Sequence, residues 1–266
     1  MKKTFAVLNL LSVILVIGIN YTSQSLRLND TTIGEISSKY SNLFTPASYA
    51  FAIWGLIFVS LLAYAIFQIR RTFFSSKENG FIKQTGYWFA SANLLNGAWV
   101  IAFLYDYTAL SVIIMLGILF SLLKIIIKTN MERWDAPIEI IAFVWWPICL
   151  YSGWISVATI ANISLYLTKI GWDGTFLSEQ QWTILMIVVA TALNIAMIFY
   201  RNMREFAAVG VWALFAIFTR HKGSLDTLAH LALFCSFILL AFIAIHGYQN
   251  RGTNPLFKWR ERLKER

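Results

Sequence analysis

Residues 151–162 read YSGWISVATIAN and lie within a long apolar block. In this stretch Trp154, Ala158 and Asn162 follow the spacing i, i+4, i+8, so their side chains are predicted to project from one face of a helix. A tryptophan and an asparagine on one face place an aromatic plane beside an amide. A membrane protein needs such a surface to hold a flat, mostly apolar ligand that carries a few polar atoms.

A second apolar block repeats this arrangement. Residues 95–103, LNGAWVIAF, place Asn96, Trp99 and Phe103 at the spacing i, i+3, i+7, and a further tryptophan, Trp54, lies in the stretch FTPASYAFAIWGLIF. At a rise of 1.5 Å per residue, the three tryptophans of these stretches lie roughly 9 to 15 Å below the outer ends of their spans. Interfacial aromatic belts and interhelical amide hydrogen bonds are the alternative explanation for such residues, and they need no ligand.

Composition identifies the class of protein. The chain is 58% hydrophobic and 13% charged, whereas soluble proteins average about 25% charged residues. The apolar residues gather in blocks long enough to cross a bilayer, without the period-two alternation of a membrane barrel. We therefore predict an all-α polytopic transmembrane helix bundle of about eight spans. The expected spans are residues 5–21, 48–69, 85–104, 109–127, 138–165, 182–200, 206–219 and 228–245. The seventh is short and contains Gly210, so a re-entrant helix is the alternative there.

The basic residues are distributed unevenly between the two sides. With a cytoplasmic N-terminus, 17 of the 22 lysines and arginines fall on the inner side, as the positive-inside rule requires. Both termini are then cytoplasmic, the 22–45 loop is external and long enough to be a lid, and the protein is expected in a bacterial inner membrane. The net charge of +9 therefore indicates contact with lipid and not with nucleic acid. The 219–226 loop, with Arg220 and Lys222, is the exception to the rule.

Three smaller features concern the first helix, the two cysteines and the C-terminal tail. Lys2 and Lys3 before an apolar run also fit a signal peptide, but no small-x-small cleavage pattern follows, so a retained first helix is expected. Cys149 and Cys235 lie in apolar blocks and are predicted to be small core residues. The basic 251–266 tail is expected to anchor on anionic headgroups.

Three motifs together resemble the tryptophan-rich sensory proteins, the translocator protein (TspO/MBR) family. Members carry an aromatic, proline-containing stretch before helix two, an L-N-x-x-W-x-x-x-F run in helix three and a Y-x-x-W-x-x-x-A-x-x-x-N run in helix five. The resemblance covers roughly residues 1–167 as a five-helix unit. It leaves residues 168–250 as three additional helices and residues 251–266 as a basic cytoplasmic tail. The chain looks like a divergent, extended member.

The resemblance implies a hydrophobic or tetrapyrrole-like small molecule bound between helices two, three and five, for sensing or translocation. The ligand-binding residues that it implies are Trp54, Asn96, Trp99, Phe103, Tyr151, Trp154, Ala158 and Asn162. It requires no cofactor and admits a porphyrin or haem as ligand. Expected partners are membrane lipid and a small hydrophobic ligand, with a homodimer as an open alternative.

The sequence departs from the family pattern, and these departures limit which family properties can be expected of this chain. The double proline before helix two is reduced to Pro46, and the Pro-Pro after the helix-three tryptophan is Val100–Ile101, so no kink is expected there. The first loop contains no tryptophan, which argues against the porphyrin photochemistry associated with that loop.

Two other functions were considered. A secondary transporter could use Asp226 and His230, which lie at i and i+4, as coupling groups. Such pairs at span ends are more often simply solvated. An enzyme is not expected, because the sequence offers no nucleophile–base set, no phosphate-binding glycine loop and no cluster with metal-ligand spacing.

Overall fold

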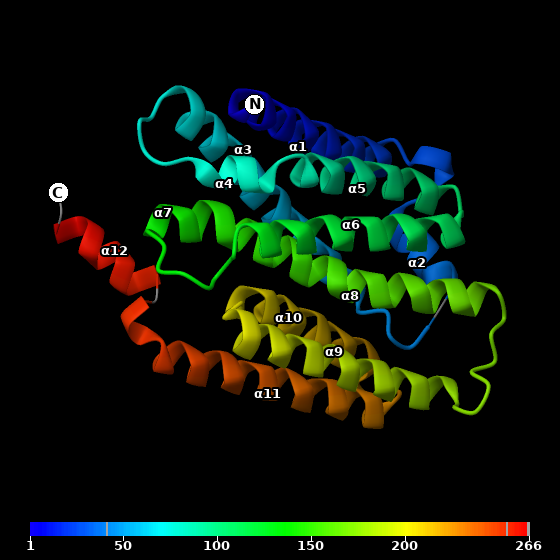
Figure 1. Ribbon diagram of the computed structural model, residues 1–266. Helices are drawn as coiled ribbons and strands as arrows, with labels where there is room; N and C mark the ends of the chain where they lie inside the picture. Colours follow the sequence, from blue (N-terminus) through cyan, green and yellow to red (C-terminus); the bar gives the residue numbers. More distant parts are fainter. Residues whose placement is uncertain (41, 254, 265–266) are drawn as a thin grey trace.

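The computed structural model describes residues 1–40, 42–253 and 255–264, which form helices joined by short connections (Figure 1). The helices are α1 (Lys2–Ser25), α2 (Ile33–Lys39), α3 (Ile53–Phe73), α4 (Gly80–Thr85), α5 (Trp88–Leu104), α6 (Thr108–Lys128), α7 (Ile138–Ile140), α8 (Trp146–Lys169), α9 (Glu179–Arg201), α10 (Arg204–His221), α11 (Asp226–Gln249) and α12 (Pro255–Lys264). The described part contains no strand. The predicted all-α bundle is thus confirmed.

Each of the eight predicted spans coincides with a helix. Six of them are long and apolar enough to cross a membrane, and α5 is a shorter apolar helix. The seventh predicted span is the continuous 18-residue helix α10, which passes through Gly210 without a break. It is not among the six helices that are long and apolar enough to cross a membrane, so its crossing stays a prediction. Helix α5 likewise continues through Val100 and Ile101, so the expected absence of a kink is confirmed.

The helices lie side by side in two groups. Helices α1, α3, α5, α6 and α8 form the first group and α9, α10 and α11 the second, and α10 packs against α8 to join them (Figure 1). Gly153 makes this contact close, because a Cβ there would lie 2.9 Å from the carbonyl oxygen of Phe206. Helix α8 is at the centre: the segment Ile138–Lys169 that contains it is 78% buried over its most apolar stretch, compared with 33–39% in the other five candidate spans.

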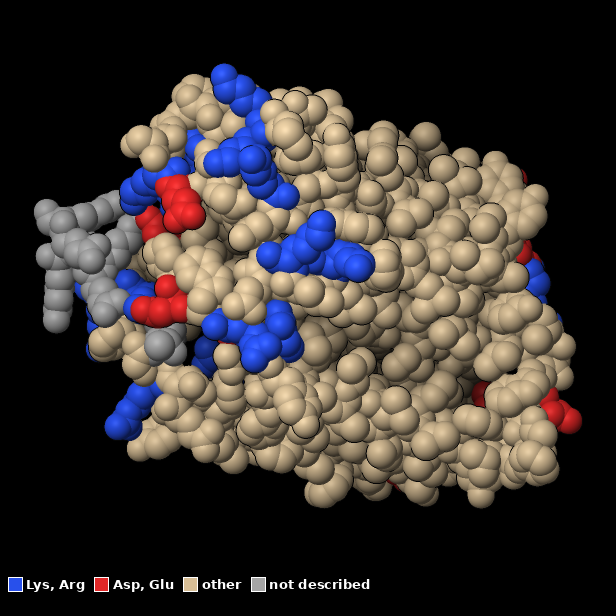
Figure 2. Space-filling view, in the orientation of Figure 1, with Lys and Arg blue, Asp and Glu red and all other residues tan. Residues whose placement is uncertain are grey.

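The outer surface of the bundle is apolar, as expected for a protein solvated by lipid. Large side chains on several helices are exposed, among them Leu11 at 56%, Val59 at 69% and Ile113 at 67%. On the face in Figure 2, lysine and arginine gather toward the end where both chain termini lie, and the middle of the surface carries almost none. This arrangement places the termini at one end of the bundle. Which side of the membrane that end faces stays a prediction from the charge bias.

Polar side chains connect α1 to the helices beside it. Asn9 donates to Gln68 of α3 at 2.9 Å, and Ser12 accepts from Asn93 of α5 at 3.1 Å. Farther along α1, Asn20 donates to an α5 amide oxygen at 3.2 Å. Such interhelical hydrogen bonds specify which faces meet inside lipid. They explain why an otherwise apolar first helix carries buried amides.

One irregular turn precedes the central helix. Residues Ile141–Trp145 form a π-helical turn directly before α8, whose first turn contains Pro147. A proline lacks the N–H that an α-helix would use at this point. π-turns change the rotational register of the residues that follow them and are frequent near functional sites.

Candidate functional site

The helix face that carries Trp99 meets the face that carries Trp154 across a small apolar chamber. Its walls come from α3, α5, α6 and α8, and α2 with the segment before η2 (Ser48–Ala52) covers its outer end. Six of the eight predicted site residues line it, namely Trp54, Trp99, Phe103, Trp154, Ala158 and Asn162. Among the described residues, none of α9, α10 or α11 lines this chamber. A role of these residues in ligand binding stays a prediction.

The aromatic rings of the chamber are packed against one another. Trp99 stacks on Phe103 with centroids 4.9 Å apart, and Trp54 stacks on Phe58 at 5.1 Å. Trp154 meets Phe51 edge-on at 6.0 Å. These side chains leave a free volume of only about 50 Å³, enough for a few water molecules. The structure is therefore a closed form of the chamber.

The amide in the chamber wall already has partners. Asn162 accepts a hydrogen bond from the Trp99 indole at 3.3 Å and donates to Ser111 at 2.9 Å. The amide thus fixes the Trp99 ring plane and links α5, α6 and α8. A polar ligand atom would compete with the indole or with Ser111 for this group.

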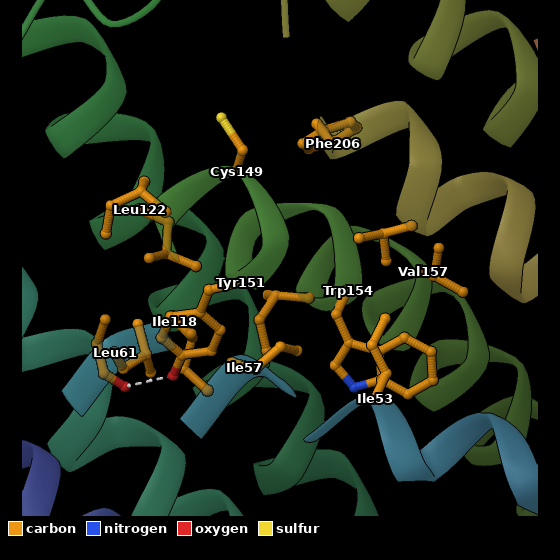
Figure 3. Close-up of a cluster of buried hydrophobic side chains, with 14 of the residues drawn as sticks. Ile53, Ile57, Leu61, Ile118, Leu122, Cys149, Tyr151, Trp154, Val157 and Phe206 are labelled. Atoms are coloured by element: carbon orange, nitrogen blue, oxygen red, sulfur yellow. Dashed lines mark hydrogen bonds between the residues drawn. The ribbon is translucent and has the colours of Figure 1, made fainter. Parts of the chain in front are cut away.

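The remaining two predicted residues lie outside the chamber. Asn96 donates to the Tyr151 hydroxyl at 3.0 Å and accepts from Asn20. The Tyr151 hydroxyl in turn donates to the carbonyl oxygen of Ala92 at 3.3 Å. Figure 3 shows Tyr151 and Trp154 pointing to the same side of α8, toward α3. The structure therefore places Asn96 and Tyr151 in an interhelical hydrogen-bond network behind the chamber wall.

The long outer loop folds into a lid, which we define as residues 28–40 and 42–47. Its helix α2 begins with a capping box between Thr32 and Glu35, which satisfies its first N–H groups. Ile33 and Ser37 of α2, with Pro46 farther along, face into the chamber. The lid lies at the end of the bundle away from the termini, where it covers the chamber (Figure 1). That this end is external stays a prediction.

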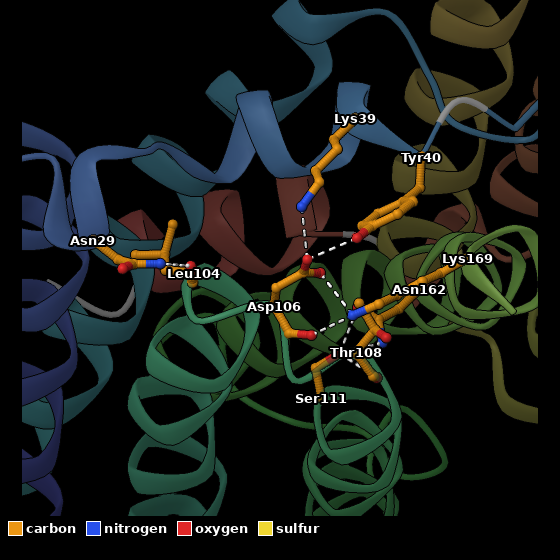
Figure 4. Close-up of polar contacts among 9 residues, drawn as sticks. All are labelled: Asn29, Lys39, Tyr40, Leu104, Asp106, Thr108, Ser111, Asn162 and Lys169. Atoms are coloured by element: carbon orange, nitrogen blue, oxygen red, sulfur yellow. Dashed lines mark hydrogen bonds and ion pairs between the residues drawn. The ribbon is translucent and has the colours of Figure 1, made fainter.

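One carboxylate fastens the lid to the bundle. Asp106, in the turn between α5 and α6, accepts hydrogen bonds from Lys39 at 2.8 Å and from the Tyr40 hydroxyl at 2.7 Å (Figure 4). Its other oxygen accepts from Lys169 at the end of α8 at 3.0 Å. Partial burial raises the pKa of Asp106, but these three donors outweigh burial, so the pKa falls to about 2. The carboxylate is therefore ionised throughout the physiological pH range.

Helix α10 holds the other half of the lid. Arg220 donates to the carbonyl oxygen of Thr45 at 2.6 Å, and the His221 ring lies 2.8 Å from the carbonyl oxygen of Leu43. The Trp212 indole donates to the carbonyl oxygen of Ala50 at 3.0 Å. These contacts give Arg220, one of the residues that depart from the predicted charge distribution, a partner in the lid.

A wider groove adjoins the chamber on the side of α1. It has a volume of about 740 Å³ and runs between α1, α2, η2 and α3. Ile33, Phe51 and Trp54 line both the groove and the chamber. These three side chains form a partition that separates the groove from the chamber.

The pair proposed for a transporter has ordinary surroundings. Asp226 accepts a hydrogen bond from the Gly223 N–H at 2.9 Å, next to the start of α11. The His230 side chain is exposed. Both side chains are exposed, as is usual for charges at helix ends, so this geometry does not favour the transporter alternative.

A comparison with protein families matches residues 6–245 to the family described as TSPO-like protein. The chain belongs to this TSPO-like family. The matched residues include α9, α10 and α11. Together, the family match and the apolar helices show that this TSPO-like chain is an integral membrane protein. No curated protein and no solved structure gives a match.

Sequence reasoning missed two parts of the site in this TSPO-like protein. Phe51 lies three residues before Trp54 and was read only as part of an aromatic stretch, although it separates chamber and groove. Asp106 was not singled out, although it is the one acidic residue in the short turn between two outer helix ends. Its partners are distant in sequence, so only the fold could assign them.

Proposed function

We propose that this TSPO-like protein binds a flat, hydrophobic small molecule of the tetrapyrrole or sterol class in the chamber beneath the lid, for sensing or translocation. One observation carries the proposal. Three indoles from three different helices, those of Trp54, Trp99 and Trp154, line one chamber together with the Asn162 amide. Helix packing alone does not require three indoles to line one chamber. It also does not require that chamber to adjoin the groove beside α1.

The closed volume determines how a ligand would enter. Sites for drug-sized molecules enclose about 300 to 1,000 Å³, whereas the chamber has about 50 Å³. The partition side chains Phe51 and Trp54 therefore have to turn, or the lid has to lift, before a ligand can bind. The groove beside α1 supplies lipid-facing space from which an apolar molecule would reach that partition.

Quenching of tryptophan fluorescence by added ligand tests the proposed binding site. Protoporphyrin IX, haem and a panel of sterols are titrated into the purified protein in lipid nanodiscs while tryptophan fluorescence is followed. Saturable quenching is expected for the wild type. Ala158→Phe fills the chamber and is expected to abolish saturable quenching, whereas Trp182→Ala, at the start of α9, is expected to leave the affinity unchanged. Equal affinities in the wild type and Ala158→Phe would refute the proposed site.

Binding and transport are separated by a second measurement. Vesicles reconstituted with the protein and loaded with the bound ligand are assayed for efflux. Binding without efflux supports sensing, and efflux that Ala158→Phe blocks supports translocation through the chamber.

A further inference from the structure

Three residues with metal-ligating side chains meet at the end of the bundle that holds the termini. Glu132 lies in the connection between α6 and α7, Cys149 lies on α8, and Glu205 is in the first turn of α10. One carboxylate oxygen of each glutamate and the Cys149 sulfur all lie within 4.8 Å of one another. Figure 3 shows Cys149 on the side of α8 near Phe206, turned away from Tyr151 and the chamber. The cluster is therefore separate from the proposed ligand site.

The buried polar atoms of this cluster lack protein partners. Glu132 Oε1 and Glu205 Oε2 are buried and accept no hydrogen bond. His246 on α11, which is only 5% exposed, has a buried Nδ1 without a partner as well. Buried polar groups are nearly always satisfied, so three such atoms together indicate a missing partner.

There is space beside the cluster for that partner. A cavity of about 220 Å³ is lined by Glu132, Glu205 and His246, and also by the charged residues Arg133, Asp135 and Arg204. The Glu132 and Glu205 carboxylates and the His246 imidazole therefore share one space with two guanidinium groups, and the Arg204 Nε is itself buried without a partner.

We propose that Glu132, Cys149 and Glu205 form a binding site for a divalent transition metal of the zinc class. A thiolate with carboxylates suits zinc and its neighbours, whereas calcium and magnesium take oxygen ligands. Bonds of about 2.0 to 2.3 Å in tetrahedral geometry place ligand atoms about 3.5 Å apart, so the three atoms need to close by only about 1 Å. The Cys149 thiol loses its proton to solvent when the metal binds, and His246 or water completes the coordination.

The site would join parts of the fold that are far apart in the sequence. One metal ion would connect the α6–α7 connection, the central helix α8 and the first turn of α10. It would lock the second helix group onto the first at the end opposite the lid. The added helices would then be fixed at both ends, by the metal at one and by their contacts with the lid at the other.

Cobalt(II) tests the site with a direct spectroscopic readout. The full-length protein in nanodiscs, stripped with a chelator, is titrated with Co²⁺. We expect saturation at one equivalent, with a thiolate-to-cobalt charge-transfer band in the near ultraviolet and visible bands of tetrahedral cobalt. Cys149→Ser is expected to abolish the charge-transfer band. The matched control Cys235→Ser removes the other buried cysteine, on α11, and is expected to keep it.

Two further variants and a stability measurement complete the test. Glu205→Gln is nearly isosteric and is expected to weaken Co²⁺ binding by more than about tenfold, a loss that outer-shell partners alone can cause. Zn²⁺ is expected to raise the melting temperature of the wild type and of Cys235→Ser but not of Cys149→Ser. The proposal is overturned if the wild type gives no charge-transfer band, or if Cys149→Ser retains the band in full.

Discussion

Replacing Asp106 by asparagine should loosen the lid without altering the chamber beneath it. The substitution keeps the size of the side chain and removes its charge. Asp106 Oδ2 accepts from Lys39 and Tyr40, and Oδ1 accepts from Lys169. Asparagine offers one acceptor oxygen in place of two, so part of this network must be lost.

The magnitude follows from the burial of each contact. The Tyr40 hydroxyl donates to a charged oxygen, a bond worth about 1.5 kcal/mol, and the half-buried Lys169 pair adds about 0.5 to 1 kcal/mol. The Lys39 side chain is 54% exposed, so solvent screens that pair and it is left out of the sum. If asparagine keeps about half of the total, the closed lid loses about 1 kcal/mol, which is roughly a fivefold rise in lid opening.

Hydrogen exchange measures this opening. Amides of α2 are followed by mass spectrometry in nanodiscs, and those of Asp106→Asn are expected to exchange roughly fivefold faster than those of the wild type. The control is Asp135→Asn, which removes the ion pair with Lys258 at the other end of the bundle. It is expected to leave α2 protection unchanged. Identical α2 protection in Asp106→Asn and the wild type would refute the assigned role of the carboxylate.

The sign of the pH dependence gives an internal check. The pKa of Asp106 is lowered to about 2, so its stabilisation is fully present above the unfolded value of about 3.9 and is lost only as the pH falls toward 2. Between pH 8 and pH 5, α2 protection corrected for intrinsic exchange should therefore stay constant. Added salt should reduce it, because the contacts are partly exposed.

Other predictions concern the site, the helix contacts and the topology. Trp154→Ala should weaken ligand binding by about 1 to 3 kcal/mol, or about ten- to hundredfold, whereas Trp182→Ala should not; equal dissociation constants in fluorescence titrations would count against an indole wall. Gly153→Ala places a Cβ 2.9 Å from an α10 carbonyl oxygen and should destabilise the fold by about 1 to 3 kcal/mol. The control is Gly18→Ala, whose Cβ would meet nothing within 4 Å, and unchanged denaturation midpoints in both variants would contradict the close contact of α8 with α10. A reporter fused to the C-terminus should be active in the cytoplasm, and activity only outside it would overturn the topology drawn from the basic residues.

The helices could be predicted because lipid imposes a simple rule on the sequence. Every span needs a run of apolar residues, and each of the eight runs found by this rule coincides with a helix, including α10 in spite of Gly210. It did not locate the short helix α2, since the capping box at Thr32 and Glu35 was not used as a start signal. Helix α12 in the basic tail was also missed, because its sequence is polar and carries no apolar run.

The residues of the candidate site could be predicted where several of them share one helix face. Trp154, Ala158 and Asn162 share a face of α8, and the structure places all three in the chamber wall. Tyr151 shares the motif but lies a turn earlier and turns to an α5 amide. Contacts between distant segments could not be predicted: Glu205 lies beside Glu132 and Cys149, which are more than 50 residues away in the sequence.

The hydrogen bonds of α1 also constrain the order in which the protein can assemble during synthesis. Gln68, the partner of Asn9, is synthesised 59 residues later, and Asn93, the partner of Ser12, is synthesised 81 residues later. At 5 to 20 residues per second, translation takes roughly 3 to 16 s to supply these partners. During that interval the first helix carries unmatched amides that the bilayer solvates poorly. Helix α1 must therefore stay beside the insertion machinery until α3 and α5 emerge, and a nascent chain arrested before α5 should be a substrate for membrane quality control.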